Sequence, residues 1–171
     1  MSLDGYIARP NGEYDWIIMD PAIDFTALFN EFDTLVMGRR TFEVFRSQGP
    51  DHPASGMKVV VCSRTLRPSD YPDITIVSSL VPQTVAALKA EPGKDIWLFG
   101  GGALFRSLLD AQLVDTIEVG VMPILLSEGI PILPAGQASP ALRLDDSKTL
   151  PSGILMLSYR VENRAAERMN R

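Results

Sequence analysis

Short apolar runs alternate with helical patterns along the first two thirds of the chain, and this alternation limits the folds that the chain can adopt. Runs rich in β-branched and aromatic residues predict buried strands at 34–37, 58–62, 74–77 and 96–99. Amphipathic patterns predict helices at 20–32, 40–45, 83–91 and 103–111. Such an alternation is typical of a mostly parallel sheet with helices on both faces.

The last third of the chain carries strand patterns alone, at 116–125, 141–144 and 154–161. Strands that follow one another without helices favour an antiparallel edge. The predicted fold class is therefore α/β, with a mostly parallel central sheet, helices on both faces and an antiparallel C-terminal edge. The 171 residues fit one domain, 1–171, whose polar tail at 163–171 is expected to fray.

Composition excludes several classes of function. No apolar run reaches the ~18 residues of a membrane span, and residues 1–5 lack the features of a signal peptide. We therefore expect a cytoplasmic protein with no membrane partner. The net charge of −5, without a long basic run, disfavours nucleic acid as a partner. Cys62 is the only cysteine, so no disulfide forms within the chain and no metal site is expected, while His52 is interpreted as solvated.

Three consecutive glycines, Gly100, Gly101 and Gly102, stand between a predicted strand and a predicted helix. The free N–H groups of such a helix start, together with the helix dipole, suit a phosphate or pyrophosphate. A tight strand-to-helix turn without any ligand is the alternative. No Lys-Ser/Thr pair follows, so the turn is not a P-loop, and its spacing does not match the Rossmann fingerprint.

Two other predicted strands end in residues that suit an anion. They are followed by Gly38, Arg39, Arg40 and Thr41 in one case and by Ser63 and Arg64 in the other. Ligands of open α/β sheets gather outside the carboxyl ends of the strands, so these residues are predicted to share one edge with the glycine turn. The planar fork of arginine suits a phosphate monoester, although each arginine taken alone fits a solvated surface position equally.

Five segments, in this order and spacing, resemble the dihydrofolate reductase-like superfamily. Within it they resemble the stand-alone relatives of the RibD C-terminal reductase domain. The segments are 2–8 (SLDGYIA), 37–43 (MGRRTFE), 63–64 (SR), 100–102 (GGG) and 123–131 (PILLSEGIP). The resemblance covers residues 2–161. The chain lacks the zinc-binding motif of the deaminase domain that accompanies the RibD reductase.

The resemblance implies NADPH as the cofactor and hydride transfer from its nicotinamide. Gly38 to Thr41 would hold the diphosphate and part of the adenosine phosphate, and Ser63 and Arg64 would hold the 2′-phosphate. The remaining cofactor residues, which would cradle the diphosphate, are Gly100, Gly101, Gly102, Ala103 and Leu104. The family pattern also implies a cis peptide bond between two of these glycines.

Four residues are candidates for the substrate side of the site. Asp4 and Asp24 are the candidate catalytic acids, since Asp24 corresponds roughly to the proton-relay carboxylate of dihydrofolate reductases. Asp24 equally fits a helix-start acid. Tyr6 and Trp16 are candidate substrate-binding residues, and Trp16 equally fits the core. Riboflavin-pathway reductases usually carry a basic residue at the position of Tyr6, which weakens the case for a ribose-phosphate substrate.

Three functions follow as hypotheses. The first is an NADPH-dependent reductase of a small pterin- or pyrimidine-like heterocycle. The second is the 5-amino-6-(5-phosphoribosylamino)uracil reductase of riboflavin biosynthesis. The third is a non-catalytic nucleotide-binding or dimerising module. A homodimer is expected, as in relatives. The family usually opens with an apolar strand before the segment at 2–8, so a start upstream of Met1 is also expected.

Overall fold

The computed structural model describes residues 1–49 and 56–162, so His52 and the predicted tail at 163–171 lie outside the described residues. The chain divides into two compact units. The parallel unit is Asp24–Leu113, and the antiparallel unit combines Met1–Ile23 with the chain from Val114 onward. The single domain predicted for residues 1–171 stays a prediction.

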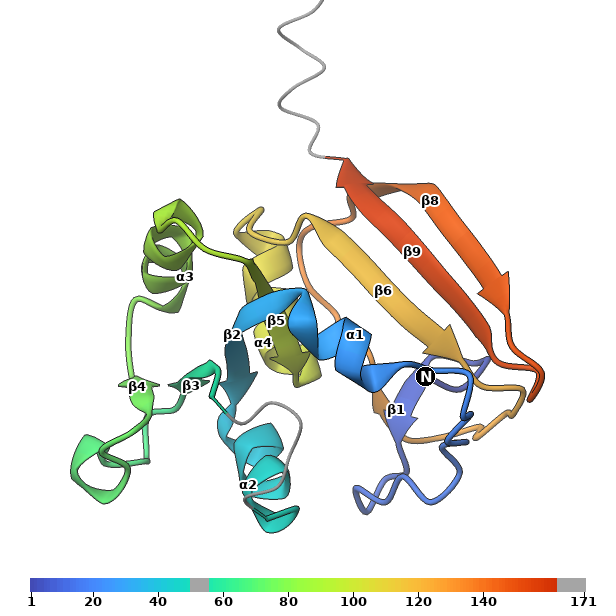
Figure 1. Ribbon diagram of the computed structural model, residues 1–171, viewed down its shortest axis with the longest axis horizontal. Helices are drawn as coiled ribbons and strands as arrows, with labels where there is room; N and C mark the ends of the chain where they lie inside the picture. Colours follow the sequence, from blue (N-terminus) through green and yellow to red (C-terminus); the bar gives the residue numbers. More distant parts are fainter. Residues whose placement is uncertain (50–55, 163–171) are drawn as a thin grey trace, which may run out of the picture. The chain divides into compact units, whose positions relative to one another are not determined.

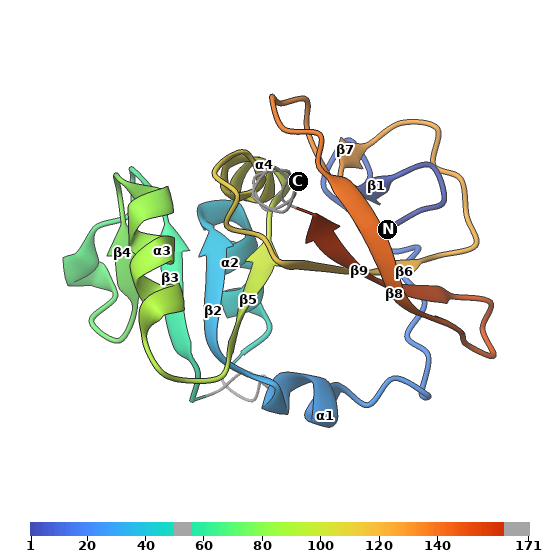
Figure 2. The same ribbon diagram turned by 90° about the horizontal axis from the view of Figure 1, so that it is seen from above.

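The parallel unit contains a four-stranded parallel sheet in the order β4-β3-β2-β5. Its strands are β2 (Phe32–Gly38), β3 (Lys58–Cys62), β4 (Thr75–Val77) and β5 (Asp95–Gly100). Its helices are α1 (Phe25–Asn30), α2 (Arg39–Ser47), α3 (Val81–Ala90), α4 (Gly102–Asp110) and the short 3-10 helix η1 (Pro68–Asp70). Figures 1 and 2 show α2 and α3 on opposite faces of this sheet, which confirms the predicted arrangement.

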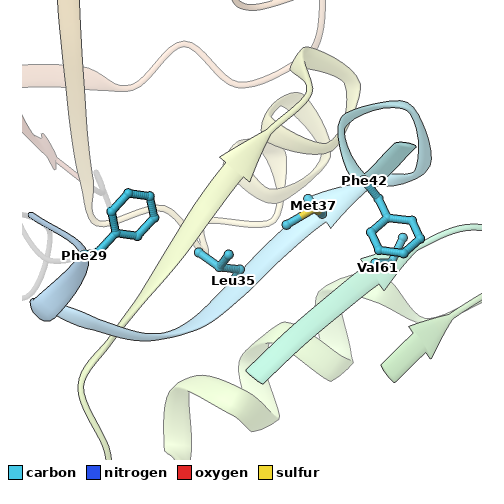
Figure 3. Packing of buried hydrophobic residues seen from close by; sticks show 5 residues of the cluster. All are labelled: Phe29, Leu35, Met37, Phe42 and Val61. Atoms are coloured by element: carbon cyan, nitrogen blue, oxygen red, sulfur yellow. The ribbon is translucent and has the colours of Figure 1, made fainter. Parts of the chain in front are cut away.

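The alternation of side chains along a strand explains why this sheet is covered on both faces. On one face, buried Leu35, Met37 and Val61 pack with Phe29 of α1 and Phe42 of α2 (Figure 3). The intervening Val36 and Val60 are also buried and point to the other face. The continuous apolar character of β2 and β3 therefore reflects burial on both faces rather than at one.

The antiparallel unit contains a three-stranded sheet in the order β6-β9-β8 and a two-stranded ladder of β1 and β7. The bounds are β1 (Tyr6–Ala8), β6 (Thr116–Val121), β7 (Ile130–Pro131), β8 (Ala141–Thr149) and β9 (Leu155–Glu162). Met1 and Leu3 exchange backbone hydrogen bonds with the chain just beyond β6, and Ser2 pairs there with Met122 in parallel. Trp16, Met122, Leu150 and Ile154 form the core of this unit.

Several predicted element bounds were wrong. The helix expected at 20–32 is only α1, because the Asp24 side chain caps it by accepting from the Ala27 amide, while Phe32 already belongs to β2. The strand expected at 116–125 ends at Val121. The strand expected at 141–144 continues to Thr149 past a register shift between Leu144 and Asp146. The antiparallel strands form a sheet of their own.

Among the described residues, no helix is both long and apolar enough to cross a bilayer.

Candidate functional site

The parallel register brings the ends of three strands together. Gly38 of β2 pairs with Cys62 of β3, and Met37 pairs with Gly100 of β5. The residues that follow these strands therefore lie at the same edge of the sheet, as the sequence predicted for the glycine turn, the two arginines after β2 and the Ser63-Arg64 pair. Cys62 is half-buried there, and burial raises the pKa of its thiol to about 11.

The glycine turn connects β5 to α4 without side chains. The peptide bond between Gly100 and Gly101 is cis, as the family pattern implied, and Gly100 has a φ of +134°. Gly101 is the N-cap of α4 and no side chain caps this helix. The amides of Leu104 and Phe105 already donate to the Gly101 carbonyl, and the Leu104 side chain is buried. The amides of Gly102 and Ala103 are thus the donors that an anion would meet first.

A second uncapped helix start lies directly beside the first. Gly38 is the N-cap of α2, again without a side-chain cap. A Cβ atom placed on Gly101 would lie 3.5 Å from Thr41 Oγ1, and one placed on Gly38 would lie 4.0 Å from the Gly100 carbonyl oxygen. The positive ends of two helix dipoles therefore converge where the Thr41 hydroxyl can donate as well.

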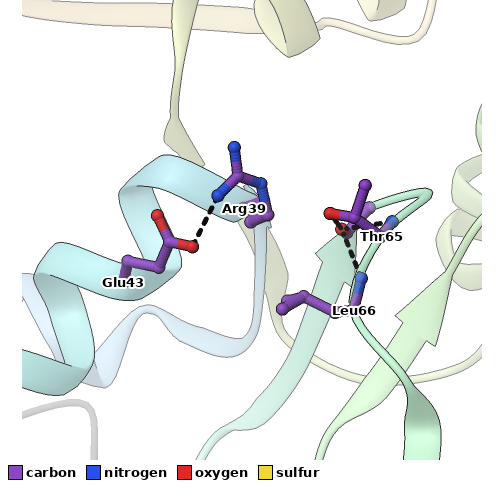
Figure 4. A network of polar contacts seen from close by, with 5 residues as sticks. Arg39, Glu43, Thr65 and Leu66 are labelled. Carbon is purple, nitrogen blue, oxygen red and sulfur yellow. Dashed lines mark hydrogen bonds and ion pairs between the residues drawn. The ribbon is translucent and has the colours of Figure 1, made fainter.

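Three arginines follow the strands at this sheet edge, and they differ in whether an acidic side chain pairs with them. Arg39 Nη1 lies 2.7 Å from Glu43 Oε1, one helical turn further along α2 (Figure 4). Arg40 and Arg64 are exposed, and neither has an acidic partner within the described part of the chain. The guanidinium groups of Arg40 and Arg64 are therefore free to bind an anion, whereas Arg39 would have to share its charge with Glu43.

Ser63 builds the turn that carries Arg64. Its buried Oγ accepts hydrogen bonds from the Thr65 amide at 3.2 Å and from the Leu66 amide at 3.1 Å (Figure 4). A serine in this position fixes the backbone of the following residues. Ser63 thus acts first as a positioning residue, and the exposed Arg64 and Thr65 are the side chains that this turn presents to solvent.

The candidate acid Asp4 belongs to the antiparallel unit and accepts several hydrogen bonds. Its Oδ2 accepts from the Ser127 amide at 2.7 Å and from the Leu126 amide at 3.1 Å. The Ser2 hydroxyl and these amides hold the pKa of Asp4 below its ordinary value. An ionised carboxylate is a poor proton donor at neutral pH, so the visible role of Asp4 is to anchor the chain at Leu126 and Ser127.

The other three substrate-side candidates are divided between the two units. Asp24 is exposed in the parallel unit, where its carboxylate caps α1. Trp16 is buried in the core of the antiparallel unit, against Met122 and Ile154. Tyr6 belongs to β1, and its ring lies against Gly129. The catalytic roles of Asp4 and Asp24 and the binding roles of Tyr6 and Trp16 stay predictions.

The antiparallel unit also contains a hollow that the sequence did not reveal. It has a volume of about 300 Å³ and is lined by Arg9, Pro10, Asn11, Leu126 and Glu128. These residues come from two segments more than a hundred positions apart in the sequence, so no local pattern indicated that they meet. Among the described residues, no group of three or more His, Cys, Asp or Glu side chains is placed to hold a metal ion.

Comparison with known proteins decides the family. The model of the RibD C-terminal domain matches residues 1–156. The Bacillus subtilis protein YyaP, described as uncharacterized, is 34% identical over 170 residues, which cover 93% of this chain and 90% of that protein. The chain belongs to the RibD C-terminal domain family. This confirms the resemblance seen in the sequence.

Solved structures agree with membership of the RibD C-terminal domain family. A putative riboflavin biosynthesis protein from Shewanella sp. PV-4 is 30% identical to this chain and superposes on it with a TM-score of 0.81. The match covers 95% of each of the two chains. A pyrimidine reductase-like protein from Corynebacterium diphtheriae shares the fold at 16% identity, with a TM-score of 0.68 over 95% of this chain and 89% of that one. A bifunctional deaminase/reductase from Thermotoga maritima also shares the fold, at 14% identity and with a TM-score of 0.71. The match covers 94% of this chain and 54% of the Thermotoga maritima chain.

Proposed function

We propose that this protein is an NADPH-dependent reductase that transfers a hydride to a small heterocyclic substrate. The observation that carries the proposal is the convergence of two uncapped, glycine-led helix starts at one sheet edge that also carries exposed arginines. This arrangement fits a dinucleotide with three phosphate groups. Membership of the RibD C-terminal domain family, whose relatives include proteins described as reductases, supports the same reaction class.

The phosphate groups of the cofactor each have residues that fit them. The amides of Gly102 and Ala103 at the start of α4, with Gly38 and Thr41 at the start of α2, would hold the diphosphate. Arg64, on the turn that Ser63 fixes, and Arg40 would hold the 2′-phosphate through charge-assisted hydrogen bonds. When bound, NADPH supplies the hydride. The protein holds the cofactor in place and orients the substrate.

A second candidate is the reduction of 5-amino-6-(5-phosphoribosylamino)uracil. The family model and the Shewanella relative, described as a putative riboflavin biosynthesis protein, favour it. The Thermotoga maritima relative, described as this reductase joined to a deaminase, shares only the fold. Tyr6 stands where those reductases usually carry a basic residue, which argues against a phosphorylated substrate for this chain.

A third candidate is a non-catalytic nucleotide-binding module, and it is supported by the structural roles of the two candidate catalytic acids. Both predicted acids serve as hydrogen-bond acceptors for backbone amides, Asp4 in a loop and Asp24 in a helix cap. Turnover with a heterocyclic substrate would exclude this candidate. Cofactor binding without turnover of any pterin or pyrimidine would favour it.

Cofactor titration tests the leading proposal. We expect NADPH to bind more tightly than NADH, followed by cofactor fluorescence. Arg64→Ala removes a charge-assisted hydrogen bond worth ~1.5–3 kcal/mol, so it should weaken NADPH binding about 10- to 100-fold and leave NADH binding unchanged. Arg143→Ala, in the antiparallel sheet, is the matched control and should change neither affinity. Equal affinity of the unaltered protein for both cofactors would contradict the assignment of the arginines.

A further inference from the structure

The turn that carries Glu128 makes contacts with the rest of the antiparallel unit on both sides of this residue. Asp4 fixes the amides of Leu126 and Ser127, and Ser127 has a left-handed backbone with a φ of +67°. A non-glycine residue in that region is uncommon and is often found at functional sites. Gly129 follows with a φ of +157°, and a Cβ atom there would overlap the carbonyl oxygen of Ala8. Glu128 therefore lies between amides that Asp4 binds and a glycine that packs closely against the Ala8 carbonyl.

Glu128 lines the hollow without any partner of its own. It is exposed, and in the part of the chain that the structure describes its carboxylate makes no ion pair or hydrogen bond. Arg9, which lines the same hollow, is already paired with Asp15: Nε lies 2.7 Å from Oδ1, and Nη2 lies 3.3 Å from Oδ2. The positive charge of the hollow is compensated, whereas the negative charge of Glu128 is not.

The remaining walls suit a flat ring. Leu126 and Pro10 supply apolar surface, and the Asn11 side chain supplies an amide whose oxygen already accepts from the Glu13 backbone. A volume of about 300 Å³ lies at the lower end of the range for small-molecule sites, which fits one ring or two fused rings. A carboxylate is an acceptor only and has two oxygens, so it matches an edge with two neighbouring N–H donors.

The local charge also selects against phosphate. The lining of the hollow contains one acid, Glu128, and one base, Arg9, which is already paired with Asp15. A phosphate group would gain no free guanidinium there and would meet the unpaired carboxylate of Glu128. Two like unit charges 4 Å apart repel each other by about 1 kcal/mol even in bulk water.

We propose that the hollow of Arg9, Leu126 and Glu128 is a binding site for the amino-substituted edge of an unphosphorylated nitrogen heterocycle, with Glu128 as the hydrogen-bond acceptor. That this heterocycle is the substrate rests on the proposed reductase function. Its binding in the hollow does not, because every residue of the hollow belongs to the antiparallel unit and the cofactor residues belong to the parallel unit.

The test uses the full chain labelled with ¹⁵N and two probes, 2,4-diaminopyrimidine and uridine 5′-monophosphate. We expect 2,4-diaminopyrimidine to shift the amide signals of Leu126, Ser127 and Glu128 in a saturable way. The exposed, isosteric Glu128→Gln should weaken this binding at least tenfold. Glu13→Gln, a change of the same kind at an acid outside the hollow lining, should leave it unchanged. Uridine 5′-monophosphate should bind the hollow at least tenfold more weakly than 2,4-diaminopyrimidine.

Three results would overturn the proposal. They are shifts that fall elsewhere in the chain or are absent, an unchanged affinity in Glu128→Gln, and equal or tighter binding of the phosphorylated probe at these amides. The spectrum of each variant shows independently that it is folded. Titration of the same samples with NADPH separates the two proposals, because loss of cofactor binding with retained diaminopyrimidine binding contradicts only the reductase function.

Discussion

At the scale of single residues, several polar side chains in this chain act on the backbone. Asp4, Asp24 and Ser63 each accept hydrogen bonds from amides two or more positions away. All three were singled out in the sequence as groups that touch a ligand. A pattern of residue types indicates where chemistry can occur, but it does not reveal which side chains are occupied in holding the backbone.

Asp4 provides a pH-dependent test of this distinction. Its pKa is lowered in the folded protein, so its contribution to stability is present above the ordinary value of 3.8 and is lost as the pH falls through the lowered pKa. Asp4→Asn should therefore melt at a lower temperature than the unaltered protein at pH 7, and the difference should shrink below about pH 4. Thermal melts across pH 2.5–8 measure this, with Glu13→Gln as control; a difference that persists undiminished at low pH would contradict it.

At the scale of elements, prediction from sequence was accurate where burial is local and continuous. The strand at Lys58–Cys62 was predicted to the residue, because a strand buried on both faces shows in the sequence as a continuous apolar run. The strands β1 and β7, with three and two residues, were missed, since they pair with each other across a separation of more than a hundred positions. The hollow beside them was missed for the same reason.

The helix α2 offers a test of the packing that positions the arginines. Phe42 is 1% exposed and packs edge-on against Tyr71, with ring centroids 5.4 Å apart. Phe42→Ala should lower the free energy of unfolding by ~3–5 kcal/mol, because it leaves a cavity in the core. Val44→Ala, on the same helix but 43% exposed, should change it by no more than ~0.5 kcal/mol. Urea unfolding measures both values, and similar losses in the two variants would disagree with the packing seen in Figure 3.

At the scale of the whole molecule, the homodimer expected from the sequence stays a prediction. The edge strand β8 is exposed along its whole length and carries Leu142 and Leu144, the latter 51% exposed. Exposed leucines on an edge strand favour association. Sedimentation equilibrium should then give twice the chain mass of 18.8 kDa, and Leu144→Lys should give the single mass. A single mass for the unaltered protein at tens of micromolar would show that it is a monomer.

The half-buried thiol of Cys62 has a practical consequence for such measurements. With its pKa raised to about 11, the sulfur stays protonated at the pH of an ordinary assay, and only the thiolate exchanges with disulfides or attacks alkylating reagents. Oxidative cross-linking of two chains is therefore slow, so the association state can be measured without a reductant. For the same reason, a thiol-reactive dye would label this single position, next to Ser63, only slowly until the pH approaches about 11.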